Sequence, residues 1–411
     1  MDPPQDKGQV AYWSVFLLGA GVLAPWNSFI TAVDYFEAVY PGSHMDRKFS
    51  VLYMPAMLVT LSIMVVWNKL FSLTARVRVG LSAFTVILIL VPIIDAIFVH
   101  GVKASPAAQI ITLAGLFLVG VFDGVCQGAV IAESAYLPGL YQQAYTSGTA
   151  ASGLLISFLR IATKLALPDT TKGLRVSTTI YFLTSAMICF ACLMIHSKIL
   201  PTLPFVKFYK EKADRADQDQ KGISFTENDG DNGIEADDVG LVSKSRKGRD
   251  YVQVTRKMLH PVIALMMMYL VTLTIFPGVP AEDVHSKVLG DWYGILLITI
   301  YNIADFVGKY MPAYTPAIQK GWVLTMATAS RLLFLPIFLL AMKFSPIPVL
   351  LFFLVFALGL TNGYLTTNAF MMGSASLSGN EYDIGGNIMV LALVIGLVMG
   401  AFGGWAILAF E

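Results

Sequence analysis

Long apolar runs alternate with short polar segments along almost the whole chain. As α-helices rising about 1.5 Å per residue, the runs are long enough to cross roughly 30 Å of hydrocarbon. Backbone polar groups inside a bilayer must pair with one another, which only helices and closed barrels allow. Because the period-two alternation of a barrel strand is absent, the pattern predicts an all-α polytopic membrane protein. The eleven predicted transmembrane helices cover about 10–32, 49–71, 77–99, 107–137, 141–167, 176–195, 259–277, 289–310, 322–342, 347–372 and 384–410.

A polar stretch divides these runs into six and five. Its middle, 210–250, is rich in Asp, Gly, Lys and Ser and has few aromatic residues, a composition typical of disorder. The sequence therefore predicts an N-terminal six-helix bundle over 1–197, a disordered loop over 198–258 and a C-terminal five-helix bundle over 259–411. Lysines and arginines flank the loop on both sides, which favours a cytoplasmic loop and a cytoplasmic N-terminus.

Composition narrows the class of protein further. The chain is 56% hydrophobic and 13% charged with a mean hydropathy of +0.67, whereas soluble proteins carry about 25% charged residues. The formal net charge is +1 and basic residues do not cluster with aromatic ones, so no nucleic-acid partner is expected. The three cysteines lie inside apolar runs without metal-ligand spacing. Neither a metal nor another cofactor is predicted.

One predicted helix carries an acid and a base at helical spacing. Asp305 and Lys309 are four residues apart and share a face, which Tyr301 and Asn302 extend. A charge at the bilayer centre costs about 2.5 kcal/mol or more, so this face should point away from lipid. It is either a structural ion pair between helices or one wall of a substrate path.

Further polar residues interrupt several other predicted helices. Distributed in this way, they predict a polar cavity at the centre of the bundle. The positions are Trp26 and Asn27 after a helix-breaking proline, Asp123 and Gln127 on one stripe, Ser147, Arg331 and Asn362.

Arg160 and Lys164 form a second basic pair at helical spacing. Two cations four residues apart repel each other unless acids lie nearby. Asp123, Glu133 and Asp169 are the expected partners.

Catalysis is not expected. All five histidines fall in predicted loops or at helix ends, and no His-Glu-x-x-His or Gly-x-Ser-x-Gly motif lies within a span.

Taken together, these residues make the sequence resemble the equilibrative nucleoside transporter family, and it is similar to the plant members in particular. The resemblance covers nearly the whole chain and depends on the order and spacing of short stretches. These are Pro25-Trp26-Asn27, Gln127-Gly128, Tyr136-Leu137-Pro138, Ser147-Gly148, Phe276-Pro277-Gly278-Val279, Asn302 to Gly308, Arg331-Leu332 and Thr361-Asn362-Gly363-Tyr364-Leu365.

The resemblance implies a pseudo-symmetric six-plus-five bundle like that of the major facilitators, with one central site and alternating access. It assigns Trp26 and Gln127 to the nucleobase, Asp305 to the ribose hydroxyls and Arg331 to transport. Asn27, Asp123, Ser147, Asn302 and Asn362 would support or gate this site. Lys309 departs from the family pattern, which has arginine there; lysine offers a point charge in place of a planar fork.

The resemblance implies purine and pyrimidine nucleosides, such as adenosine and uridine, as substrates. It also implies the plasma membrane as the location, because that is the usual location in the family. Transport by facilitated diffusion and by proton symport both stay open, with Asp305, Asp123, Glu133 and Asp95 as candidate proton carriers. Apart from lipid and protons, no other partner is expected. A carrier of nucleobases or another small polar solute is the nearer alternative, and a non-transporting receptor or scaffold the more distant one.

Overall fold

A computed structural model gives the fold of the chain. It describes residues 3–43, 45–67, 71–98, 106–168, 170–226, 251–276, 289–290, 292–344, 348–379 and 381–409.

Seven helices form the N-terminal bundle, and they confirm the first six predicted runs to within a few residues. A short helix after the first run, α2, is an addition that the hydropathy pattern did not indicate. The elements are α1 (Val10–Thr31), α2 (Val33–Val39), α3 (Met45–Val66), α4 (Leu73–Phe98), α5 (Pro106–Ala135), α6 (Gly139–Ala166) and α7 (Thr171–Met194).

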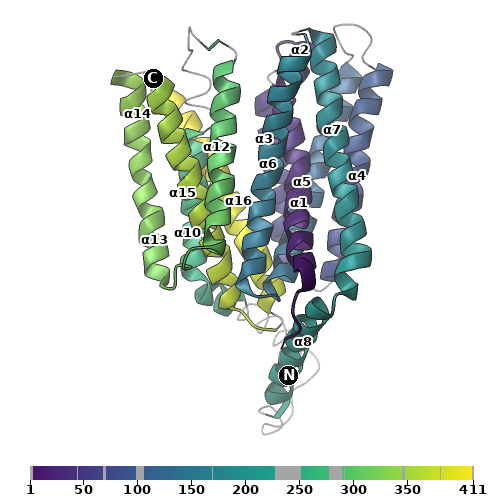
Figure 1. Ribbon diagram of the computed structural model, residues 1–411, viewed down its shortest axis with the longest axis vertical. Coiled ribbons are helices and arrows are strands. Elements are labelled where there is room, and N and C mark those ends of the chain that lie inside the picture. Colours follow the sequence, from purple (N-terminus) through teal and green to yellow (C-terminus); the bar gives the residue numbers. More distant parts are fainter. Residues whose placement is uncertain are drawn as a thin grey trace, which may run out of the picture.

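The C-terminal bundle faces it across the molecule (Figure 1). One predicted run is broken in its middle by a 3₁₀ turn, Ser330–Leu333, which places Arg331 at the break. The elements are α10 (Leu259–Ile275), α12 (Trp292–Tyr310), α13 (Gly321–Ala329), α14 (Phe334–Phe344), α15 (Pro348–Ala375) and α16 (Glu381–Ala409).

Nine helices of the described segments are long and apolar enough to span a membrane, and a tenth follows if Tyr251–Lys257 and α10, bent by 76°, count as one span. The helix α12 is not among them, because Asn302, Asp305 and Lys309 lower its hydropathy. The all-helical membrane fold is therefore confirmed, whereas the number of eleven spans stays a prediction.

The prediction of disorder after the first bundle is wrong for its first part. Residues Pro204–Thr226 form a helix, α8, which extends from the end of the bundle where α1 begins (Figure 1). The stretch is polar, but its Lys, Glu, Asp, Ala and Gln residues include strong helix formers. Phe205 at its start anchors it to the bundle, with its ring 5.1 Å from that of Tyr141. Residues 227–250 of the predicted loop lie outside the described residues.

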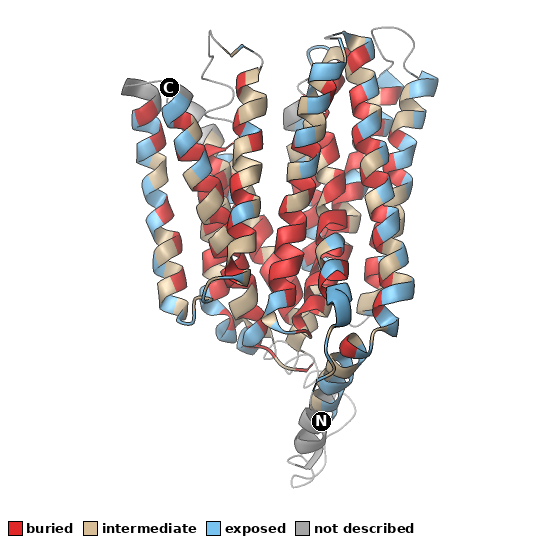
Figure 2. Ribbon diagram, viewed as in Figure 1, coloured by how far each residue is buried: buried red, intermediate tan, exposed pale blue. Residues whose placement is uncertain are grey.

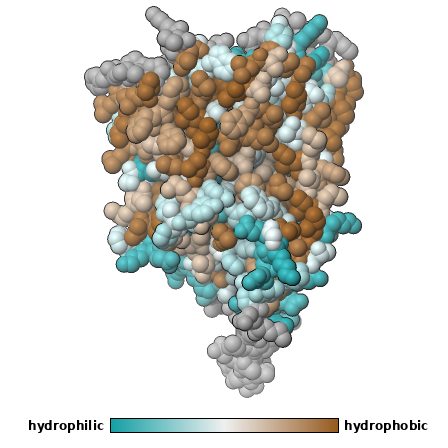
Figure 3. All heavy atoms as spheres, viewed as in Figure 1, coloured by the Kyte–Doolittle hydropathy of each residue, from teal (hydrophilic) through white to brown (hydrophobic). Residues whose placement is uncertain are grey.

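Hydrophobic residues cover much of the visible face between the two ends, and hydrophilic residues gather toward the α8 end (Figure 3). The C-terminal end of α16 lies at the opposite end from α8 (Figure 1). Buried residues are concentrated where the bundles converge, in the part of the molecule nearer α8 (Figure 2).

Glycines allow the bundles to touch at the α8 end. A Cβ atom on Gly386 of α16 would lie 2.6 Å from the carbonyl oxygen of Gly128 on α5. Beside this contact, Arg76 of α4 donates to Asp383 at 2.9 Å and to Asn387 at 2.7 Å. The rings of Tyr136 and Tyr382 meet edge to face at 5.0 Å. Burial raises the pKa of the Tyr136 hydroxyl, and Glu133 adds to the effect.

The glycine contact makes a testable prediction about conformation. Gly386→Ala places a methyl group against backbone that has no room for it, so the α8 end should open more often. We expect cysteines introduced on that side of the path to become several-fold more reactive toward a membrane-impermeant maleimide. Gly294→Ala is the matched control, since no atom lies within 4 Å of its added Cβ. Equal labelling of both variants would contradict a closure held by this contact.

Candidate functional site

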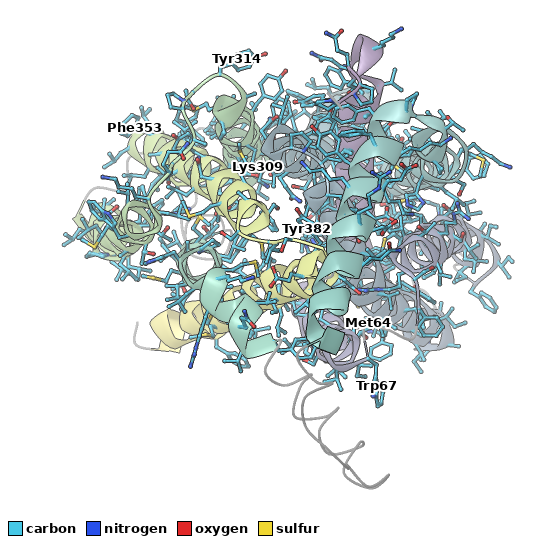
Figure 4. The ribbon with its side chains drawn as sticks, turned by 90° about the horizontal axis from the view of Figure 1, so that it is seen from below. Met64, Trp67, Lys309, Tyr314, Phe353 and Tyr382 are labelled. Carbon is cyan, nitrogen blue, oxygen red and sulfur yellow. The ribbon has the colours of Figure 1, made fainter. Side chains whose placement is uncertain are left out.

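Asp305 and Lys309 form an ion pair inside the protein. The Lys309 Nζ atom lies 2.8 Å from Asp305 Oδ2, and the two residues are 5% and 6% exposed. Helical spacing alone makes them neighbours, and the packing of α15 against α12 keeps water away. Gly308, between them on α12, and Gly363 on α15 permit this close packing, because a Cβ atom at either would strike the opposite backbone. Seen from the α8 end, Lys309 lies toward the middle of the molecule, whereas Phe353 and Trp67 lie at its edge (Figure 4).

A chain of hydrogen bonds continues from this pair to the broken helix. Asn362 of α15 donates to Asp305 Oδ1 at 2.8 Å, and its own oxygen accepts from Thr272 at 3.0 Å. Arg331 donates to Thr272 at 2.8 Å and to Asn362 at 3.3 Å. The 3₁₀ turn directs the guanidinium inward, where it supports Asn362 and, through it, Asp305. Arg331 does not pair with Asp305 directly.

The same face of α12 meets α6 of the other bundle. Lys309 Nζ donates to Thr149 at 3.3 Å, and Gln143 donates to the Lys309 carbonyl oxygen at 3.3 Å. Asn302 donates to Ser157 at 2.7 Å and does not bond to Asp305. The predicted polar stripe on α12 is therefore real, but its Asn302 end forms a contact between the bundles.

Tyr301, next to Asn302 on α12, forms an aromatic surface with Phe276. Its ring stacks on that of Phe276 at 4.5 Å. The adjoining Pro277-Gly278-Val279 stretch lies outside the described residues.

The face of α12 that carries Asp305 and Lys309 is the first wall of the candidate site, and the N-terminal bundle supplies a second wall. The Trp26 ring stacks on that of Tyr53 from α3 at 4.4 Å, and the Tyr53 hydroxyl donates to Asp123. Buried polar atoms normally have a partner. Asp123 Oδ1 and Gln127 Oε1 are buried and have no hydrogen-bond partner among the described residues, and the Tyr145 hydroxyl lies beside the Gln127 amide. Tyr145 also lies within electrostatic range of Asp123, so the two unpartnered oxygens lie close to one hydroxyl group, and they indicate a place where water or a ligand binds.

Two tyrosines connect these walls, and the sequence did not single them out. Tyr145 of α6 lies within electrostatic range of Asp123 and of Tyr269 on α10. Tyr269 in turn lies within range of Asp305 and Lys309. From the sequence alone, a tyrosine of a binding site that lies in an apolar run cannot be distinguished from an aromatic residue of the core. Only the fold shows that Tyr145 and Tyr269 lie within electrostatic range of each other.

The remaining predicted residues have structural neighbours. Asn27 donates to Ser152 at 2.9 Å, so it ties α1 to α6. Ser147 accepts from Gln143 at 2.7 Å beside the Lys309 carbonyl contact. Both lie on helices of the second wall, but neither supplies one of its two unpartnered oxygens.

The expected partners of Arg160 on α6 are wrong, whereas the expected pairing of Lys164 with Asp169 stays a prediction. Arg160 pairs with Asp34 of α2, and Lys164 lies 5.8 Å from the centre of the Trp292 ring on α12. Asp34 follows the apolar core of the first helix, and only the fold shows that α2 brings it to Arg160. Asp169 lies outside the described residues.

A cavity of about 280 Å³ lies away from these walls, near the start of α8. Glu133 and His196, 2.7 Å apart, line it together with Lys207. In the described part of the chain, no group of three or more His, Cys, Asp or Glu side chains could hold a metal ion.

Two bundles joined along a buried polar seam define a multi-pass helical membrane protein with the major facilitator fold. The proton:xylose symporter XylE aligns with 99% of this chain and 90% of its own at a TM-score of 0.65 and 11% identity. The transporter FucP in its outward conformation covers 97% of this chain and 92% of its own, at a TM-score of 0.60 and 12% identity.

Sequence comparisons then give the family. The family described as "Nucleoside transporter" matches residues 113–409. Equilibrative nucleotide transporter 8 of Arabidopsis thaliana is 37% identical over 98% of this chain and 96% of its own. Equilibrative nucleotide transporter 1 of the same plant is 35% identical over 98% and 87%. This chain belongs to the nucleoside transporter family, and it is a transporter and not an enzyme.

Proposed function

We propose that this protein carries nucleosides across the membrane by alternating access, through one site between the two walls. The observation that carries the proposal is the buried Asp305 carboxylate. Lys309 and Asn362 hold it in place but use only part of its hydrogen-bond acceptor positions. An ionised carboxylate offers about four acceptor positions, of which these two neighbours use two. The remaining positions suit the vicinal hydroxyls of a ribose, which form strong charge-assisted bonds out of water.

The opposite wall suits a nucleobase. Trp26 and Tyr53 supply flat apolar surface, and Gln127 supplies an amide that can both donate and accept. Adenosine and uridine, each with a planar base and two ribose hydroxyls, share these requirements. A free nucleobase would leave Asp305 without a ligand, and a sugar would leave the flat surface of Trp26 and Tyr53 without one.

Charge favours a nucleoside over a nucleotide. Lys309 is already neutralised by Asp305, and Arg331 is held by three neutral oxygen partners away from the pair. A phosphate entering beside Asp305 would meet a like charge, which is unfavourable in a site without water. Although the named relatives are nucleotide transporters, we assign this chain uncharged substrates.

The topology that we propose has eleven spans, with the N-terminus and α8 in the cytoplasm and the plasma membrane as residence. Lys207, Lys210, Lys212 and Arg215 on α8 support this orientation by the positive-inside rule. In that orientation, the contact between Gly128 and Gly386 closes the cytoplasmic side.

Uptake of labelled adenosine into proteoliposomes, with empty liposomes as the control, tests the proposal. Excess unlabelled adenosine or uridine should abolish uptake, whereas AMP, adenine and ribose should compete at least about tenfold more weakly. Stronger competition by AMP would assign the site to nucleotides, and stronger competition by adenine would assign it to nucleobases. A purified, folded protein that takes up none of these would support the receptor or scaffold alternative.

A further inference from the structure

The four candidate proton carriers differ in their partners. Three of them have a basic neighbour: Asp305 with Lys309 at 2.8 Å, Asp95 with Arg175 at 2.6 Å and Glu133 with His196 at 2.7 Å. Asp123 is 1% exposed and forms no ion pair with any residue that the structure describes. Tyr53 donates to its Oδ2 atom, and its Oδ1 atom has no partner there.

Among the residues that the structure describes, the helices packed around α5 bring no unpaired cation to Asp123. Tyr53 on α3, Tyr145 on α6 and Cys126 on α5 itself are the ionisable groups nearby. The α1 helix has no charged residue. Arg76 on α4 is committed to Asp383 and Asn387 of α16 and to the Val125 carbonyl oxygen. A buried ionised carboxylate costs several kcal/mol unless it is paired and fully hydrogen-bonded, and Asp123 is neither.

We propose that Asp123 binds a proton that is carried across the membrane with the substrate. This inference rests on the proposed nucleoside transport and adds its energetics. The proton enters from water on the side opposite α8 and occupies Oδ1 while the bundles are closed. When the contact between Gly128 and Gly386 opens, water reaches the carboxyl group, stabilises its ionised form and accepts the proton on the α8 side.

The position of Oδ1 explains how proton and substrate would be coupled. Asp123 and Gln127 are four residues apart on α5, each has a buried oxygen without a partner among the described residues, and the Tyr145 hydroxyl lies near both side chains. A protonated Oδ1 becomes a donor to a base placed against Gln127. Substrate and proton then strengthen each other's binding reciprocally, typically by 5–150-fold in such linked systems (about 1–3 kcal/mol).

The test compares two assays in the same proteoliposomes: accumulation of labelled adenosine driven by an inward proton gradient, and exchange of labelled for unlabelled adenosine without a gradient. We expect the wild type to accumulate adenosine and to lose this accumulation with a protonophore. Asp123→Asn is neutral like the protonated acid but cannot release a proton. Its ratio of accumulation to exchange should fall at least about fivefold, and its exchange should no longer depend on pH.

The matched control is Glu133→Gln, which changes the paired carboxylate on the same helix and should keep the wild-type ratio. Wild type that exchanges adenosine but never accumulates it would overturn the proton role while leaving nucleoside transport intact. Accumulation that survives in Asp123→Asn would do the same. Wild type that performs neither assay would overturn the proposed function itself.

Tyr53→Phe provides a second variant if Asp123→Asn does not fold. Its ring still stacks on Trp26, but the hydroxyl that donates to the ionised carboxylate is gone. A donor of this kind favours the ionised form. Without it the acid should hold its proton to higher pH, so the midpoint of the pH profile for exchange should move in the alkaline direction. A midpoint that stays in place or moves the other way would contradict Asp123 as the titrating group.

Discussion

Asp305→Asn is expected to lower adenosine uptake at least about a hundredfold. The substitution removes the charge that strengthens the ribose contacts, and it leaves Lys309 buried without its anion. Hydrogen bonds to a charged group are worth about 1.5–3 kcal/mol each, so two weakened ribose contacts give at least a hundredfold loss at about 1.4 kcal/mol for each factor of ten. Uptake per molecule of correctly inserted protein is the measurement that checks the loss.

A double substitution separates substrate contact from stability. Asp305→Asn combined with Lys309→Gln leaves no buried charge at this position, so the melting temperature in detergent should return toward that of the wild type. Uptake should stay low, because no ionised acceptor faces the ribose. Recovery of both melting temperature and uptake would assign Asp305 a purely structural role.

Helical periodicity is the reason why this part of the site was predictable. Asp305 and Lys309 are neighbours on any α-helix, and a charge pair in an apolar run must face inward. Their 2.8 Å separation therefore follows from local structure. The long runs were predictable for the same reason, since the hydrocarbon thickness sets their length.

Contacts between helices distant in the chain were beyond such reasoning. Nothing local shows that Arg160 pairs with Asp34, which lies 126 residues away. Likewise, Asp123 and Glu133 are equivalent as buried acids on one predicted helix. Only the fold shows that His196 reaches Glu133 while Asp123 receives a single tyrosine donor.

The helix α8 illustrates a different limit of prediction. Its composition is that of a solvated segment, and hydropathy does not distinguish a polar helix from a disordered loop. The contact of Phe205 with Tyr141, together with good helix formers, stabilises the helix where a burial argument alone predicts none.

Lys309→Ala should abolish uptake nearly as completely as the change at Asp305, whereas Lys309→Arg should keep it. Alanine leaves Asp305 as a buried anion without a cation, which favours its neutral form and removes an acceptor from the ribose. Arginine keeps the charge and adds a planar fork of donors. Its extra donors can reach a ribose oxygen, so Lys309→Arg should also discriminate more strongly against 2′-deoxyadenosine.

The measurement is competition of labelled adenosine uptake by adenosine and by 2′-deoxyadenosine, in wild type and in both variants. The decisive result is adenosine uptake by wild type and Lys309→Arg that is much higher than uptake by Lys309→Ala. Normal uptake by Lys309→Ala would show that Asn362 alone keeps Asp305 ionised and aimed, since it is the other group that bonds to that carboxylate. The ion pair would then be a contact between turns of α12, and the ribose would be held from the Asn362 side.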